Sequence, residues 1–143
     1  MILTKMLTTK IHNIIALDVG DKRVGIALTN TLAKLPRPYR TIVRDESFWN
    51  NLEQIIADEE VQEIVVGIPR NLSSNDTPQT TITKQFIDEL TAKHDIPVQT
   101  IDEALTSSQA EKELLKRGKK FAKGYIDALA AVYILEDYLK SGV

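Results

Sequence analysis

Three carboxylates occupy positions where the surrounding apolar pattern would normally exclude charge. Asp18 interrupts the apolar run 14–19, Glu103 follows a predicted strand, and Asp127 shares a face with apolar residues of the last predicted helix. A buried carboxylate costs several kcal/mol unless it is paired, hydrogen-bonded or bound to a metal. Three such anions at close range need a cation, and oxygen ligands favour Mg²⁺ or Mn²⁺. If they meet, they indicate phosphodiester hydrolysis by an activated water.

Two of these acids also have structural explanations. At a strand end, Asp18 could accept hydrogen bonds from backbone N–H groups of the turn 19–22. Near the start of a helix, Asp127 would be favoured by the helix dipole. Neither residue alone distinguishes a structural role from a catalytic one. The distinction depends on whether the strands and helices that carry these acids bring them together.

Alternating apolar runs and turn residues predict those elements. Two apolar runs, Ile14 to Val19 and Val24 to Leu28, flank a short polar link and predict a buried hairpin. Leu35 to Val43 contains two prolines and predicts an outer strand. Apolar periodicity and capping residues predict a helix over 46–59, a strand over 61–68, a helix from Asp76 or Thr77 to His94, a strand over 96–101, a helix from Thr106 to Gly118 and a helix over 125–139.

This order predicts an α/β fold with a mixed five-stranded sheet flanked by helices. The first three strands are expected to be antiparallel, and the last two to be added in parallel by right-handed crossovers. Sites in such sheets lie beyond the carboxyl ends of the parallel strands. Asp18 lies near the end of the first strand and Glu103 follows the fifth, so a helix that docks Asp127 beside them would complete the cluster.

Composition limits the alternatives. The 143 residues, 43% hydrophobic, suit one domain over 13–143 after a flexible leader over 1–12. The absence of cysteine and the presence of only two histidines exclude thiolate sites and histidine clusters. No run resembles a signal peptide or a membrane span, so we expect a cytoplasmic protein with no membrane partner.

Charge is segregated along the chain although the net charge is only −2. Asp45 to Glu63 holds seven acidic residues and no basic one. Residues 118–124, here called the lysine segment, carry Lys119, Lys120 and Lys123 without an acid. Such a segment is either a solvated linker or binds the phosphate backbone of a nucleic acid. Phe121 within it would either stack on a base or pack on the core.

Four segments in this order closely resemble the YqgF family, also called RuvX: Leu17 to Gly25, Val66 to Asn71, Asp102 to Thr106, and Asp127 to Ala131. The resemblance runs from about Ile14 to Leu139. It implies a ribonuclease-H-like fold and a nuclease that processes the 5′ end of pre-16S rRNA, with a Holliday junction resolvase as the older proposal for the group. Asp18, Glu103 and Asp127 match the family's acidic positions, which implies that they are the catalytic residues and the ligands of Mg²⁺ or Mn²⁺.

Further residues are expected to contact nucleic acid. They lie in the matched segments or in the lysine segment, and are Arg23, Arg70, Asn71, Lys119, Lys120 and Lys123. One departure stands out, because Ala104 occupies a position where the family usually has an arginine that could clamp a phosphate or orient the adjacent carboxylate.

Three functions remain open from the sequence. The first is a metal-dependent nuclease acting on structured RNA such as pre-16S rRNA. The second is a resolvase of branched DNA, which would use the same chemistry but needs two active sites. It therefore requires a homodimer, whereas the ribonuclease could be a monomer or a homodimer. The third is a non-catalytic nucleic-acid-binding domain on a nuclease fold, which Ala104 would favour.

Overall fold

The computed structural model describes residues 11–71, 73, 75–103 and 123–141. Most of the predicted leader, the helix expected from Thr106, and residues 118–122 of the lysine segment lie outside these ranges. At the end of the predicted leader, the His12 N–H donates to Thr31 Oγ1 (2.9 Å) and the Thr31 N–H donates to the His12 carbonyl (3.1 Å). His12 is thereby joined to the chain beyond the second strand.

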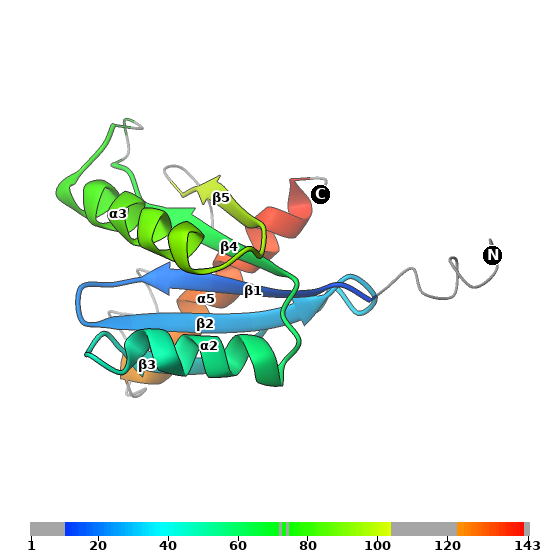
Figure 1. Ribbon diagram of the computed structural model, residues 1–143. Coiled ribbons are helices and arrows are strands. Elements are labelled where there is room, and N and C mark those ends of the chain that lie inside the picture. The colour runs from blue at the N-terminus through cyan, green and yellow to red at the C-terminus, as the bar shows by residue number, and fades with distance from the viewer. Residues whose placement is uncertain (1–10, 72, 74, 104–122, 142–143) are drawn as a thin grey trace.

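Five strands form one mixed sheet in the order β3-β2-β1-β4-β5 (Figure 1). Their bounds are β1 Asn13–Val19, β2 Arg23–Asn30, β3 Arg37–Val43, β4 Glu63–Ile68 and β5 Val98–Asp102. β1, β2 and β3 pair antiparallel, whereas β4 joins β1 in parallel and β5 joins β4 in parallel. The predicted mixed sheet is confirmed, including the directions of all five strands.

Helices cover both faces of the sheet. On one face lie α2 (Phe48–Asp58) and α3 (Pro78–Lys93), and on the other lies α5 (Lys123–Lys140) (Figure 1). Successive side chains of a strand point to opposite faces, so Ile15 and Leu17 of β1 enter the cluster that contains Phe48 and Phe86. The intervening residues Ile14 and Ala16 enter the second cluster, with Ala131, Ile134 and Leu135 of α5. By the same alternation, half-buried Asp18 faces α5.

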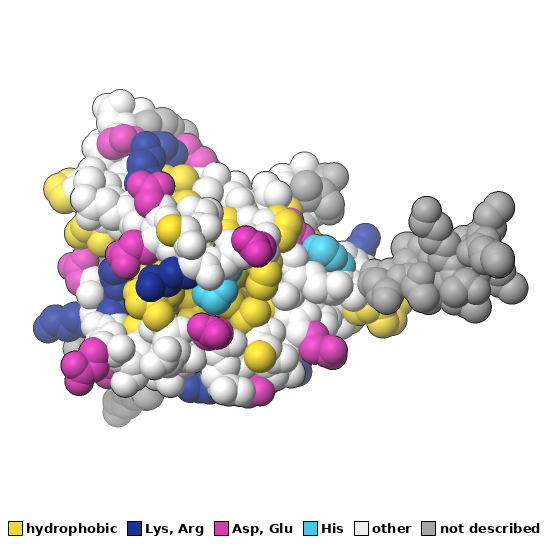
Figure 2. Space-filling view, in the orientation of Figure 1, with side chains coloured by type: hydrophobic (Ala, Val, Ile, Leu, Met, Phe, Trp, Pro, Cys, Tyr) yellow, Lys and Arg dark blue, Asp and Glu magenta, His cyan; other side chains and the backbone are white. Residues whose placement is uncertain are grey.

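The face that carries α2 and α3 bears charges of both signs. Figure 2 shows acidic and basic side chains interspersed over it, with hydrophobic side chains visible between the two helices. No continuous basic surface forms there among the side chains that the structure describes. None of the described helices is long and apolar enough to cross a bilayer.

Several element boundaries differ from the predictions by one or two residues. The β4 strand starts at Glu63 and not at Val61, because the Val61 N–H donates to the Ile56 carbonyl (3.0 Å) and Glu60 adopts a φ of 50°, which turns the chain. The β5 strand starts at Val98, two residues later than expected. Helix α5 starts at Lys123, so the last residues of the lysine segment are helical.

Capping chemistry fixes the start of α3. Thr77 is its N-cap and forms a reciprocal capping box with Thr80, and Pro78 is the first residue of the helix. Of the two predicted caps, Thr77 is therefore correct. Asp76 binds Arg70 instead.

Candidate active site at the carboxyl end of the sheet

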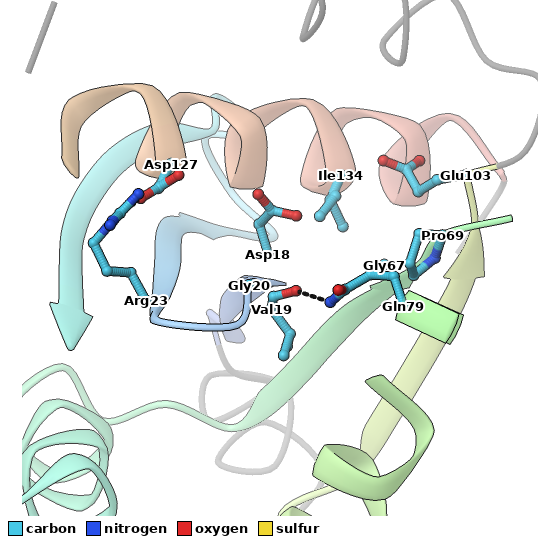
Figure 3. A pocket seen from close by; sticks show the side chains of 10 residues that line it. All are labelled: Asp18, Val19, Gly20, Arg23, Gly67, Pro69, Gln79, Glu103, Asp127 and Ile134. Atoms are coloured by element: carbon cyan, nitrogen blue, oxygen red, sulfur yellow. Dashed lines mark hydrogen bonds and ion pairs between the residues drawn. The ribbon is translucent and has the colours of Figure 1, made fainter. Parts of the chain in front are cut away.

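A cavity of about 290 Å³ lies between α5 and the carboxyl ends of β1 and β4 (Figure 3). Its lining residues come from the first two strands, the ends of β4 and β5, α3 and α5: Asp18, Val19, Gly20, Arg23, Gly67, Pro69, Gln79, Glu103, Asp127 and Ile134. All three predicted carboxylates are among them. In Figure 3 they follow one another beneath α5, with Asp18 between Asp127 and Glu103.

Glycines flank Asp18 on both neighbouring strands. Gly25 of β2 is its pairing partner, and Gly67 of β4 follows Val66, the last parallel partner of β1. A Cβ on Gly25 would lie 2.0 Å from the carbonyl oxygen of Asp127, and one on Gly67 would lie 2.7 Å from Cδ1 of Ile134. Real Cβ atoms do not approach that closely, so these glycines are what lets α5 lie directly over Asp18.

Asp127 projects from the sheet-facing side of α5, as its spacing from Ala130, Ala131 and Ile134 predicted. Its Oδ2 accepts a hydrogen bond from Nε of Arg23 at 2.7 Å. The Asp127 side chain is 19% exposed and that of Arg23 is 34% exposed. The acid on the apolar face therefore has a specific cationic partner, which the helix dipole alone would not require.

Glu103 is the most deeply buried charged side chain among the described residues, at 2% exposure. Its backbone N–H donates to the Ile68 carbonyl (3.0 Å), which carries the β4–β5 pairing one residue past Asp102. A Cβ on Gly67 would lie 3.2 Å from Cγ of Glu103. The missing side chain at Gly67 therefore gives room to α5 and to this carboxylate together.

The donor chemistry of the cavity fits a hard divalent cation. Its carboxylate oxygens are the ligands that Mg²⁺ and Mn²⁺ prefer, and its volume is many times the roughly 10–15 Å³ that one water requires. Within the described ranges, however, no three His, Cys, Asp or Glu side chains are already arranged to hold a metal. The three carboxylates therefore fit a divalent cation by their type and location. Because Asp127 is paired with Arg23, binding of the cation requires the carboxylates to move closer to one another.

Arg70 and Asn71 lie in the loop after β4 and outside the cavity lining. Arg70 bridges two carboxylates, with Nε 2.9 Å from Oδ1 of Asp76 and Nη1 2.8 Å from Oδ2 of Asp102. The hydrogen bond to Arg70 is the main cause that lowers the pKa of Asp76, and the same bond is the main cause that raises the pKa of Arg70.

The Asn71 side chain shapes the same loop. Its Oδ1 accepts hydrogen bonds from the N–H groups of Ser73 and Asn75, each at 2.9 Å. Contact of Arg70 and Asn71 with nucleic acid stays a prediction, as it does for the lysines, of which only Lys123 falls within a described element.

Two residues support the cavity without a signal in the sequence. Gln79, in the first turn of α3, lines it and donates from Nε2 to the Val19 carbonyl (3.0 Å; dashed in Figure 3). Arg44, the residue after β3, donates from Nη1 to the Gly20 carbonyl (3.0 Å), and its Cζ lies 5.3 Å from the Phe86 ring centre. Both side chains fix the β1–β2 turn beside Asp18.

Comparison with known proteins agrees with this architecture. A family model described as "RuvX: Holliday junction resolvase" matches residues 12–141. A protein of Desulforamulus reducens named "Putative pre-16S rRNA nuclease" is 40% identical over 135 residues, which cover 90% of this chain and 97% of the relative. A protein of the same name from Sulfurihydrogenibium sp. is 37% identical over 128 residues, covering 88% of each.

A solved structure shows the same fold. Thermus thermophilus RuvC, in complex with a Holliday junction substrate, superposes with a TM-score of 0.52 over 92% of this chain and 96% of its own, at 12% identity. The expected ribonuclease-H-like fold is thereby confirmed. With a family match from His12 to Ser141 and relatives above one third identity over nearly their whole length, the chain belongs to the RuvX family.

Proposed function

We propose that this protein is a nuclease that hydrolyses phosphodiester bonds in structured RNA, with the 5′ end of pre-16S rRNA as its substrate. The observation that carries the proposal is the gathering of Asp18, Glu103 and Asp127 in one cavity, although they come from the first strand, the end of the last strand and the last helix. The names of the relatives support the choice of substrate.

The three carboxylates would hold Mg²⁺ or Mn²⁺. When bound, the ion supplies Lewis-acid polarisation of the phosphate and of the attacking water. Asp18, central among the acids, is placed to accept a hydrogen bond from that water and orient it. Glu103 is buried away from bulk solvent, so its interaction with a cation in the cavity would be screened little by water.

Basic residues bind the polyanion around these acids. Arg23 brings a guanidinium into the cavity itself, where it can contact the phosphate that is cut. Lys119, Lys120 and Lys123 contribute phosphate contacts that carry affinity without reading bases. Arg70 and Asn71 shape the loop that follows Pro69 at the cavity wall, and so set which nucleic-acid strand fits there.

The description of the family supports a second candidate, a Holliday junction resolvase. It requires the same acids but two active sites in a homodimer, so the mass of the protein in solution separates the two readings. A non-catalytic binding domain is the third candidate. It predicts nucleic-acid binding without cleavage.

One experiment compares all three. The protein is incubated with Mg²⁺ or Mn²⁺ and a labelled pre-16S rRNA 5′ leader, beside a labelled four-way DNA junction. We expect cleavage of the RNA by the parent protein, and its loss in Asp18→Asn, Glu103→Gln and Asp127→Asn. Asp88→Asn, an exposed carboxylate on α3 outside the cavity lining, is the matched control and should cleave normally.

The outcomes separate the candidates clearly. Cleavage of the DNA junction without cleavage of the RNA would show that the protein is a resolvase and not a ribonuclease. Binding without cleavage of either substrate would favour the non-catalytic domain. Undiminished RNA cleavage in all three acid variants would overturn the assignment of the site.

A further inference from the structure

The Arg23–Asp127 ion pair joins the start of β2 to the first turns of α5. The hydrogen bond of 2.7 Å from Nε to Oδ2 links residues 104 apart in the sequence. Both side chains line the cavity, and both keep limited solvent access. The guanidinium therefore occupies one carboxylate of the proposed metal site.

Backbone packing holds the two residues together. Arg23 and Gly25 alternate with Val24 and so face α5 from the same side of β2. The close approach at Gly25, where a Cβ would lie 2.0 Å from the Asp127 carbonyl oxygen, fixes the backbone of Asp127 beside this strand. The pair thus follows from the docking of α5 and is not a chance contact of two long surface side chains.

Arg23 is also the sole cationic residue among those that line the cavity in the described structure. It lies there with three carboxylates, whose mutual repulsion is offset by a positive charge. The Arg23 guanidinium supplies that charge within hydrogen-bond distance of Asp127. A divalent cation would seek the same Asp127 oxygen and carries twice the charge.

We propose that Arg23 is a displaceable counter-ion: it neutralises Asp127 while the metal is absent, and the metal, on taking the carboxylate, releases the guanidinium to bind the substrate phosphate. This inference rests on the proposed metal-dependent nuclease function. Two consequences follow from it. Arg23 competes with the metal, and the metal raises the affinity for a phosphodiester by freeing Arg23, so that binding of metal and nucleic acid is positively coupled.

The first test measures Mn²⁺ binding by calorimetry and by the shift in melting temperature, without any catalytic readout. Arg23→Gln should bind Mn²⁺ about tenfold tighter than the parent, because a charge-assisted hydrogen bond no longer competes. Its melting temperature should fall without metal and rise more on adding Mn²⁺. Arg37→Gln, an exposed arginine on β3 outside this cavity, is the control and should match the parent.

The second test measures binding of a short labelled RNA with and without Ca²⁺, which occupies carboxylate sites. In the parent protein Ca²⁺ should strengthen RNA binding, and in Arg23→Gln this gain should shrink about tenfold. Arg23→Lys keeps the charge but loses the forked donor, so its Mn²⁺ affinity should lie between those of the parent and the glutamine variant. The lysine variant also serves if Arg23→Gln does not fold.

The results distinguish this inference from the function on which it rests. If Asp127→Asn weakens Mn²⁺ binding while Arg23→Gln and Arg23→Lys leave it unchanged or weaker, the competition is refuted and the metal site stands. If Asp127→Asn, Asp18→Asn and Glu103→Gln all bind Mn²⁺ like the parent, the carboxylate site itself is refuted.

Discussion

Replacing Gly25 by alanine tests whether the close docking of α5 builds the proposed active site. The new Cβ would lie 2.0 Å from the carbonyl oxygen and 2.2 Å from the carbonyl carbon of Asp127, and 2.8 Å from the nitrogen of Ala128. These are backbone atoms of a helix, so no side-chain rotation relieves the overlap. To restore an ordinary contact of 3.4 Å, the start of α5 must move by about 1.4 Å.

The cost of that movement can be bounded. Overpacking in a core costs about 1–3 kcal/mol, and a clash with backbone belongs at the upper end. For a domain of this size, 1 kcal/mol corresponds to roughly 3–4 °C in melting temperature, so Gly25→Ala should lower it by about 10 °C. Displacing Asp127 by about 1 Å relative to Asp18 should lower the cleavage rate about a hundredfold.

The matched control is a second glycine of the same region. A Cβ on Gly124, in the first turn of α5, would meet Thr41 at 3.6 Å, which is an ordinary contact. Gly124→Ala should therefore match the parent or gain up to about 1 kcal/mol in stability, since alanine favours helix. Thermal melts and cleavage rates of the two variants decide the question. A Gly25→Ala protein that melts within about 3 °C of the parent, which is the shift expected for the lower bound of about 1 kcal/mol, would refute the tight docking.

Three further predictions concern binding and pH. Ala104→Arg should raise substrate affinity about tenfold or more, because a charged phosphate contact is worth roughly 1.5–3 kcal/mol; unchanged affinity in a filter-binding titration would mean that another cation already serves. Changing Lys119, Lys120 and Lys123 of the lysine segment together to Ala should weaken the binding of all RNA sequences alike. It should also lower the slope of log K against log salt by about 0.7 per lost contact on single strands, and an unchanged slope would show that the segment is a solvated linker. Burial, and then the hydrogen bond to Glu63, raises the pKa of Tyr138 to about 12, so its contribution to stability is complete below pH 10 and is lost as the pH rises towards 12. Urea unfolding at pH 9 and 11.5 should show this loss in the parent and not in Tyr138→Phe.

Much of the fold could be predicted because its signals are local. The apolar runs on either side of the turn 20–22 specify β1 and β2, and the apolar spacing of 48–56 specifies α2. The orientation of Asp127 was also predictable, since helical periodicity alone places it on the buried side of α5. The start of β4 was not, because Glu60 takes a left-handed conformation that sequence patterns reserve mainly for glycine and asparagine.

The parts of the site that escaped prediction depend on contacts between distant segments. Gln79 donates to Val19 across 60 positions, and Arg44 reaches Gly20 across 24. Polar residues at helix starts and strand ends are common on protein surfaces, so nothing in their own neighbourhood marks these two. The Arg23–Asp127 pair is of the same kind. Arg23 was predicted to bind nucleic acid, but its partner becomes visible only once α5 is docked on β2.

The order in which the chain contributes its parts also governs when the protein can act during its synthesis. Asp18 is made early, whereas Asp127 arrives with α5, the last helix, which is also what covers the side of the sheet that holds Ile14, Ala16 and Val65. While residues 123–140 are still inside the ribosome, the nascent chain therefore exposes the apolar side chains that α5 will cover, and it lacks Asp127 at the proposed site. The proposed nuclease chemistry would be withheld from the nascent chain until residues 123–140 have left the ribosome and packed on the sheet.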